Sequence, residues 1–79
     1  MMTDDEHAVD KDVIGRNIQK MIFKVSDSVN NFALALGINR AVVYRWISGE
    51  TLPSVKTLIR IRKMYGVSID WILTGEDTE

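Results

Sequence analysis

The chain has 79 residues, 46% of them hydrophobic and 27% charged, which is enough for one small globular domain and excludes a second core. The absence of cysteine excludes a disulfide framework and a thiolate metal site, and it suits a reducing cytoplasm. The acidic N-terminus does not resemble a signal peptide and no apolar run approaches the roughly 18 residues of a membrane span, so we expect a soluble cytoplasmic protein.

Charge is unevenly distributed along the chain, although the formal net charge is only -1. Residues 1–12 sum to -4 and residues 76–79 to -3, whereas residues 13–75 sum to +6. A basic body between acidic ends favours a polyanionic partner. The competing interpretation is that these charges only solvate a small surface.

The first predicted helix starts at Val13, after an acidic arm (residues 1–12) that lacks apolar periodicity and that we expect to be disordered. Arg16, Lys20 and Lys24 are spaced four residues apart and occupy a second face of this helix. Ser-Asp-Ser at 26–28 ends it. The apolar residues that recur at three- and four-residue spacings are Ile14, Ile18, Met21, Ile22 and Val25.

Two short helices come next, joined across a glycine. Asp27 or Ser28 can cap the first of them, and Gly37 can end it in the left-handed conformation. Asn39 is suited to cap the second, which should run from Arg40 to about Ser48. Two short helices with a glycine at the break form a helix-turn-helix arrangement. The residues predicted to face inward are Phe32, Ala33, Leu36, Val43, Trp46 and Ile47.

The C-terminal part predicts two more helices. Ser54 caps the fourth and Gly66 stops it, while Ser68 and Gly75 bound a short fifth helix. The fourth helix carries an apolar stripe of Leu58, Ile61 and Met64. Because no segment alternates with a period of two, we predict an all-α domain of five helices over residues 13–76, followed by an acidic tail at 77–79.

This order of motifs resembles the DNA-binding domain of phage repressors of the lambda and 434 type, and equally that of XRE-like bacterial regulators. The resemblance covers about residues 13–76, and it implies a compact lambda repressor-like fold. The residues that carry it are Phe32-Ala33, Leu36-Gly37-Ile38, Val43, Trp46 and the ending "GVSIDWILTGE".

In this family the third helix lies in the major groove of double-stranded DNA, with its N-terminal residues against base edges. Carried over by position, the base-reading candidates are Arg40, Ala41 and Arg45, with Tyr44 close by. These residues also share one face by helical geometry, and arginine matches the two acceptors of guanine. The alternative is that both arginines are solvated residues flanking a core helix.

Phosphate contacts are implied at two helix starts, where Ser28 and Asn39 match positions at which the family binds the DNA backbone. Lys20 and Lys56 are further phosphate candidates.

Three departures from the family pattern bear on these contacts. Val29 replaces a glutamine that clamps phosphate in many relatives, and the loop that begins at Glu50 lacks their basic residues, so we expect moderate affinity. Ile22 and Phe23 are apolar where relatives are usually polar, which suggests either extra packing or an apolar patch for a partner.

The last helix bears on assembly, because related domains pair near it on an inverted repeat. It crowds Ile69, Trp71 and Ile72 into little more than one turn, and we expect these residues to form a homodimer interface. The alternative is that Trp71 packs against the first helix and that the protein is a monomer until DNA pairs it.

An enzyme is not expected, because His7 stands alone in the arm and no cysteine or glycine-rich phosphate loop accompanies it. We therefore predict no cofactor, no metal and no small-molecule substrate. The resemblance implies a transcriptional regulator, favouring a repressor of the phage, prophage or mobile-element type. The competing function is a protein-binding adaptor or antitoxin-like module on the same fold.

Overall fold

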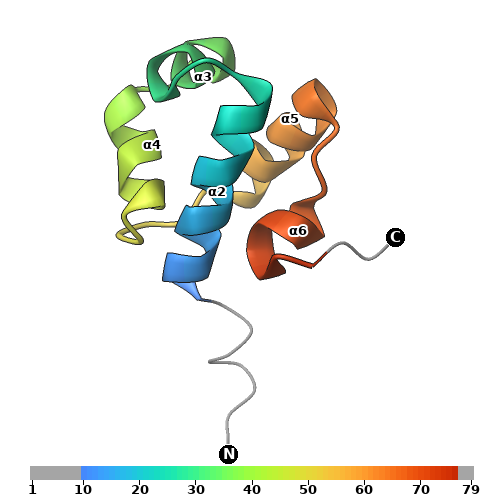
Figure 1. The fold of residues 1–79 in the computed structure, drawn as a ribbon. Helices are drawn as coiled ribbons and strands as arrows, with labels where there is room; N and C mark the ends of the chain where they lie inside the picture. The colour runs from blue at the N-terminus through green and yellow to red at the C-terminus, as the bar shows by residue number, and fades with distance from the viewer. Residues whose placement is uncertain (1–9, 77–79) are drawn as a thin grey trace, which may run out of the picture.

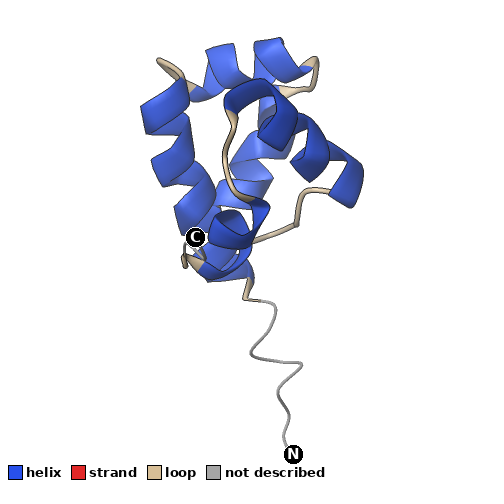
Figure 2. Ribbon diagram, turned by 90° about the vertical axis from the view of Figure 1, so that its right-hand side faces the viewer, coloured by secondary structure: helices blue, strands red, loops and turns tan. Residues whose placement is uncertain are grey.

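The computed structural model describes residues 10–76, which form five helices joined by short loops and contain no strand (Figures 1 and 2). This confirms the predicted all-α fold with five helices. The remainder of the expected arm, residues 1–9, and the expected tail at 77–79 lie outside the described residues. The helices, labelled as in Figure 1, are α2 (Lys11–Val25), α3 (Val29–Leu36), α4 (Arg40–Ile47), α5 (Val55–Tyr65) and α6 (Ile69–Thr74).

The start of α2 corrects the expected boundary of the arm. The helix begins at Lys11, two residues before Val13, because the side chain of Asp10 caps it. The carboxylate oxygen Oδ1 of Asp10 accepts hydrogen bonds from the backbone N–H groups of Asp12 at 3.0 Å and Val13 at 3.3 Å. Residues 10–12 therefore belong to the folded domain, because their carboxylates stabilise the free N–H groups of a helix start.

The other helix starts have the predicted caps. Ser28 Oγ accepts from the Asn31 N–H at 3.1 Å, which settles the choice between Asp27 and Ser28. Asn39, Ser54 and Ser68 cap α4, α5 and α6. These interactions are local in the chain, which is why the sequence alone located them.

The core lies around α2, which packs against α4 on one side and α6 on the other, with α3 across one end and α5 behind (Figure 1). Four of the five apolar residues predicted for the first helix are at most 2% exposed, and Val25 packs at their edge. The buried apolar side chains are Ile14, Ile18, Met21, Ile22, Phe32, Ala33, Leu36, Val43, Trp46, Leu58, Ile61 and Ile72.

The apolar stripe of α5 differs from the prediction at one residue. Met64 is 46% exposed, and Tyr65 instead stacks on Phe32 with ring centroids 5.7 Å apart. At about 100° per residue, seven residues from Leu58 to Tyr65 make nearly two full turns, whereas Met64 lies well off that line. The prediction for Met64 was therefore wrong.

One buried polar side chain joins the two ends of the domain. Asn17 on α2 is 6% exposed, and its Nδ2 donates to the backbone carbonyls of Trp71 at 3.2 Å and Ile72 at 3.1 Å. A short helix has no partners of its own for its last carbonyl groups. Asn17 gives Ile72 a donor and gives Trp71 a second one, because the Trp71 carbonyl also accepts from the Gly75 N–H at 2.7 Å. These hydrogen bonds fix α6 against the first helix of the domain.

Candidate nucleic-acid interface

The turn between α3 and α4 fixes the direction in which α4 leaves. Gly37 ends α3 in the left-handed conformation with φ 73°, as predicted. The backbone N–H of Ile38 then donates to the carbonyl of Ala33 at 3.0 Å. Asn39 is extended, and its Oδ1 accepts from the Ala41 N–H at 2.8 Å to begin α4. Three residues thus redirect the chain, and Asn39 accepts from the N–H groups of Ala41 and Val42 in the first turn of α4.

The inner face of α4 is held against α2 at very short range. Val43 and Trp46 are 0% and 3% exposed, as predicted. Opposite them, a Cβ atom added to Gly15 would lie 2.5 Å from the carbonyl oxygen of Trp46 and 2.6 Å from that of Ile47. Only glycine permits this approach, so Gly15 determines how closely α4 packs against α2.

The loop after α4 is also in contact with α2. A Cβ atom added to Gly49 would lie 2.5 Å from Oδ1 of Asp12, so the first turn of α2 covers this loop. Sequence reasoning missed both contacts. The sequence did contain a signal for the first contact, because Gly15 lies inside a helical pattern. An isolated glycine in a helix often marks a place where another segment packs closely.

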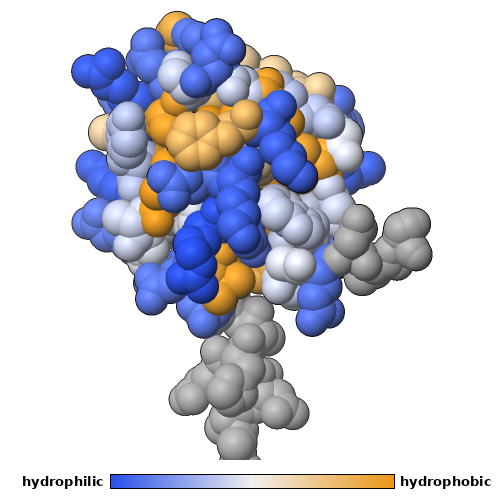
Figure 3. Space-filling view, in the orientation of Figure 1, coloured by the Kyte–Doolittle hydropathy of each residue, from blue (hydrophilic) through white to orange (hydrophobic). Residues whose placement is uncertain are grey.

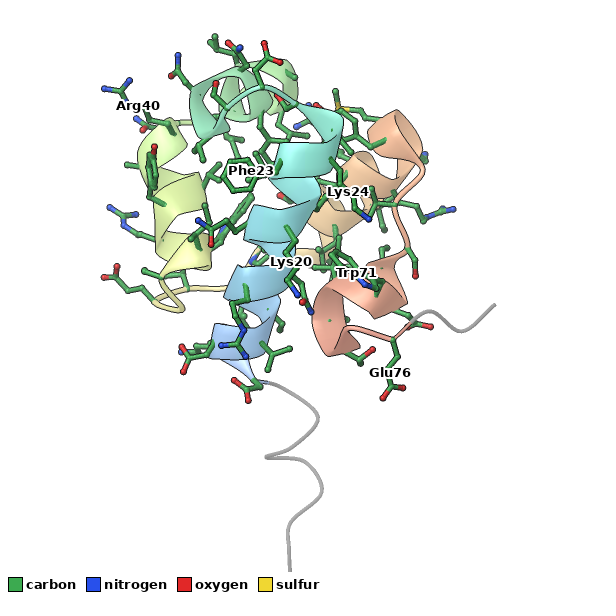
Figure 4. All side chains as sticks on the ribbon, in the orientation of Figure 1. Lys20, Phe23, Lys24, Arg40, Trp71 and Glu76 are labelled. Atoms are coloured by element: carbon green, nitrogen blue, oxygen red, sulfur yellow. The ribbon has the colours of Figure 1, made fainter. Side chains whose placement is uncertain are left out.

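The outer face of α4 carries the four base-reading candidates, and all of them are exposed: Arg40, Ala41, Tyr44 and Arg45. Tyr44 is 54% exposed. Figure 4 shows Arg40 at the start of α4, pointing away from the body of the protein. The structure therefore brings these four residues together on one open surface.

The start of α3 lies beside this surface. The Arg40 guanidinium donates to Oδ1 of Asn30 on α3 at 3.5 Å, a contact that the sequence analysis missed. Ser28 and Asn39 accept cap hydrogen bonds through oxygen atoms. The Ser28 hydroxyl proton and the Asn39 Nδ2 group are chemically able to donate to a phosphate.

The two lysines proposed for phosphate are placed differently. Lys56 is exposed in the first turn of α5. Lys20 is exposed on α2, on the side of Asn17 and α6 rather than that of Gly15 and α4, because it follows Asn17 by three residues. In Figure 4 it lies on the part of α2 that faces α6. The structure thus does not bring Lys20 to the outer face of α4.

The three residues expected at a homodimer interface are not equally available. Ile72 is 0% exposed and belongs to the core, so it contributes no surface, because this face of the short helix is covered by the domain itself. Ile69 and Trp71 are half-buried. Trp71 lines a cavity together with Met21 and Val25 of α2, which agrees with the alternative that it packs against the first helix.

The two apolar residues of the first helix that depart from the family pattern, Ile22 and Phe23, differ in their burial. Ile22 is buried and adds to the core, whereas Phe23 is 69% exposed. Figure 3, which has α2 in front, shows apolar surface over the upper part of this helix, bordered by hydrophilic side chains. Extra packing is therefore confirmed for Ile22, and Phe23 is left as exposed apolar surface.

A comparison with known protein families decides what this arrangement is. The model of the family described as helix-turn-helix matches residues 28–72, which include the caps of α3 and α4 and the whole open face of α4. The chain belongs to the helix-turn-helix family. The resemblance predicted from the sequence is thereby confirmed.

Two curated relatives are similar to this helix-turn-helix chain. A Haemophilus influenzae protein named as an uncharacterized HTH-type transcriptional regulator is 35% identical over 66 residues, which are 80% of this chain and 28% of that protein. The uncharacterized HTH-type transcriptional regulator YqaE of Bacillus subtilis is 33% identical over 67 residues, 85% of this chain and 58% of that protein. The chain thus spans less than two thirds of either relative. No solved structure matched it.

Two further properties of the described part of this helix-turn-helix chain concern metal binding and membranes. Within residues 10–76, no group of three or more histidine, cysteine, aspartate or glutamate side chains could hold a metal ion. No helix in the same residues is long and apolar enough to cross a membrane. His7 lies outside the described residues.

Proposed function

We propose that the chain is the DNA-reading domain of a transcriptional regulator, with α4 in the major groove of double-stranded DNA. The observation that supports this most is the division of α4 into two faces within the matched family segment. Val43 and Trp46 are buried, while Arg40, Ala41, Tyr44 and Arg45 are all exposed on the other side. Arginine recognises the O6 and N7 acceptors of guanine, and alanine lets the backbone approach base edges.

The finer proposal is a repressor of the phage or mobile-element type that binds an inverted repeat as a homodimer. One module of this size buries only about 600–1,000 Å² on DNA, so pairing is a means to specificity. The surface proposed for pairing is now Ile69 and Trp71, because Ile72 lies in the core. Ser28, Asn39 and Lys56 are proposed to contact phosphate.

The decisive experiment is selection of bound duplexes from a random pool, followed by affinity measurements on the selected site over a salt series. We expect a preferred sequence, and a steep fall of affinity with salt, because neutralised phosphates release counterions. A selected site with two-fold symmetry and two bound chains would support the homodimer. Recovery of random sequences with no salt dependence would contradict DNA reading.

The competing function, a protein-binding adaptor or antitoxin-like module, is favoured by one observation, which is the exposure of Phe23. This side chain is 69% exposed at a position where relatives are usually polar. An adaptor has no need of two arginines around Ala41 on one open face. The duplex selection therefore separates the two functions.

A further inference from the structure

The proposed DNA-reading face makes no use of a row of cations on α2. Arg16, Lys20 and Lys24, here called the basic stripe, are spaced four residues apart and are all exposed. At 1.5 Å per residue, they follow one another at intervals of about 6 Å along the helix axis. Like charges at this spacing repel one another, so the row destabilises the helix slightly unless an anion lies on it.

The basic stripe makes no side-chain hydrogen bond within the described part of the chain. The hydrogen bonds found there between residues 10 and 76 all involve other side chains. The one carboxylate in the sequence of α2, that of Asp12, lies against the loop after α4, close to Gly49. The basic stripe is therefore available to an anion from outside these residues.

An exposed aromatic ring lies beside the basic stripe. Phe23 is 69% exposed. It follows Lys20 by three residues and Arg16 by seven, so it lies about 60° from the first and about 20° from the second around the helix. Figure 4 shows Lys20, Phe23 and Lys24 along the middle and upper part of α2, and Figure 3 shows hydrophilic side chains next to apolar surface there. The outer face of α2 thus combines three cations with one open aromatic ring.

This combination matches the chemistry of single-stranded nucleic acid. Proteins that bind single strands place cations along the phosphates and stack the bases on aromatic side chains. A duplex offers phosphates as well, but its bases are paired inside the stack, so Phe23 would have no base to contact. We propose that the outer face of α2 binds single-stranded DNA, with phosphates on the basic stripe and one base stacked on Phe23.

Two other partners fit this face less well. Protein interfaces are depleted of lysine and have a mainly apolar centre, whereas Phe23 is the one large apolar side chain of α2 that is exposed. RNA is distinguished from DNA through its 2′-hydroxyl, and neither the basic stripe nor Phe23 can accept a hydrogen bond from that group. The choice of DNA over RNA rests on the proposed function, because a regulator bound to a duplex stands next to DNA.

The single strand and the duplex would occupy different sides of the molecule. Lys20 lies about 140° around α2 from Gly15, which packs against α4. Arg40, at the start of α4, points away from the body of the protein (Figure 4). A strand on α2 therefore leaves the outer face of α4 free. Lys20, which the sequence analysis assigned to duplex phosphate, keeps a phosphate-binding role in this proposal, but toward another strand.

Titration of the full chain with fluorescent oligo-dT of about 12 nucleotides tests the charges. Each phosphate neutralised on a single strand contributes about -0.7 to the slope of log affinity against log salt, so we expect a slope of about -2. Lys20→Gln together with Lys24→Gln should make this slope shallower by about 1.4. Arg60→Gln with Lys63→Gln removes the same charge from exposed positions on α5 and should leave the slope unchanged.

Variants of Phe23 separate base stacking from apolar contact. Phe23→Ala should weaken the binding of oligo-dT about 5- to 150-fold, which is the effect of losing one stacked base. Phe23→Leu keeps an apolar side chain without an aromatic face and should weaken binding nearly as much, whereas Phe23→Trp should bind at least as tightly. Leu34→Ala, at a residue of α3 that is also 69% exposed, is the control and should leave the affinity unchanged.

The position of the strand on the protein is tested by NMR. On addition of oligo-dT, we expect the largest changes in amide chemical shift at residues 16–24. These changes should persist in the Arg45→Ala variant, which is expected to lose its preference for the selected duplex. Single-strand binding on α2 can therefore fail while duplex reading by α4 holds, and the reverse.

Several results would overturn the proposal. Shift changes centred on Arg40 and Arg45 would place the strand on α4. An unchanged salt slope in the doubly neutralised stripe, or an unchanged affinity in the Phe23→Leu variant, would remove the contacts on which the proposal rests. Tighter binding of oligo-rU of the same length would show an RNA site. Equal competition by poly-glutamate would show a site for acidic protein rather than for a strand with stacked bases.

Discussion

At the scale of single residues, α4 and Asn17 of α2 show what a sequence can and cannot predict. Its buried and exposed positions followed from helical periodicity, because one face of a short helix must cover the core. The role of Asn17 could not be foreseen, because its partners lie 54 and 55 residues away in the chain. Nothing in the local pattern indicates that α6 would come to rest beside it.

Arg45 is the residue on which the proposed base reading is most directly tested. Arg45→Ala should cost about 1–3 kcal/mol of binding free energy on the selected duplex and relax the preference at one base pair. Arg60→Ala removes an exposed arginine from α5 and serves as the control. Binding should be measured on the selected site and on duplexes changed at each position. If the Arg45 variant kept both affinity and preference, α4 would not be the reading helix.

Asn17 should matter for stability although it lies far from the reading face. Asn17→Ala removes two hydrogen bonds and leaves the carbonyls of Trp71 and Ile72 without this donor. We expect a loss of about 1–3 kcal/mol in the free energy of unfolding. Asn31→Ala, at an exposed position on α3, should change it by less than about 0.5 kcal/mol. Urea unfolding of both variants provides the comparison, and equal midpoints would show that the α2–α6 hydrogen bonds add nothing.

At the scale of helices, the ends were predicted well and the crossings were not. Caps such as Ser28 and Asn39 act within three residues, so the sequence contains all that is needed to locate them. The close crossing of α2 and α4 depends on two segments about 30 residues apart, and only the isolated Gly15 hinted at it. The same reason explains why Ile72 was misplaced at an interface, since its burial depends on how α6 docks.

Gly15→Ala tests this crossing. Alanine is the better helix former by about 0.8–1 kcal/mol, so local propensity alone predicts stabilisation. The new Cβ atom would instead stand 2.5 Å from a backbone carbonyl of α4, and we expect a net loss of about 1–3 kcal/mol in the free energy of unfolding. Gln19→Ala, exposed on the same helix, controls for propensity. A more stable Gly15 variant in thermal unfolding would show that α4 can shift freely.

The cap of α4 provides a second test at this scale. Asn39→Ala removes the side-chain acceptor for the Ala41 N–H and should lower the free energy of unfolding by about 1 kcal/mol. Asn39→Asp retains an acceptor and should preserve stability while weakening duplex binding, because it adds a negative charge where phosphate is proposed. Chemical unfolding and duplex titration of both variants separate the two roles. Loss of stability in both would mean that the amide nitrogen, and not the cap oxygen, holds the turn.

At the scale of the whole molecule, the separation of charge was evident from the sequence, and its consequences for kinetics are testable. Neutralising Asp4, Asp5 and Glu6 changes the formal net charge from -1 to +2. We expect association with the selected duplex to become about two- to tenfold faster at low salt, because less negative charge approaches the DNA. Stopped-flow association at low and high salt measures this, with the difference vanishing at high salt. Equal rates at low salt would show that these carboxylates do not influence the encounter.

The hydrogen bonds between Asn17 and the carbonyls of Trp71 and Ile72 also bear on the order of events during synthesis. The first helix emerges from the ribosome long before α6, and its contacts with α6 close a loop of more than 50 residues. Contacts between residues so far apart in the chain form late, because closing the loop between them costs conformational entropy. Until residue 72 is outside the exit tunnel, Ile14, Ile18 and Met21 lack one of the surfaces that bury them. A nascent chain arrested a few residues short should therefore be recognised by chaperones that bind exposed apolar helices, and release of α6 should end that recognition.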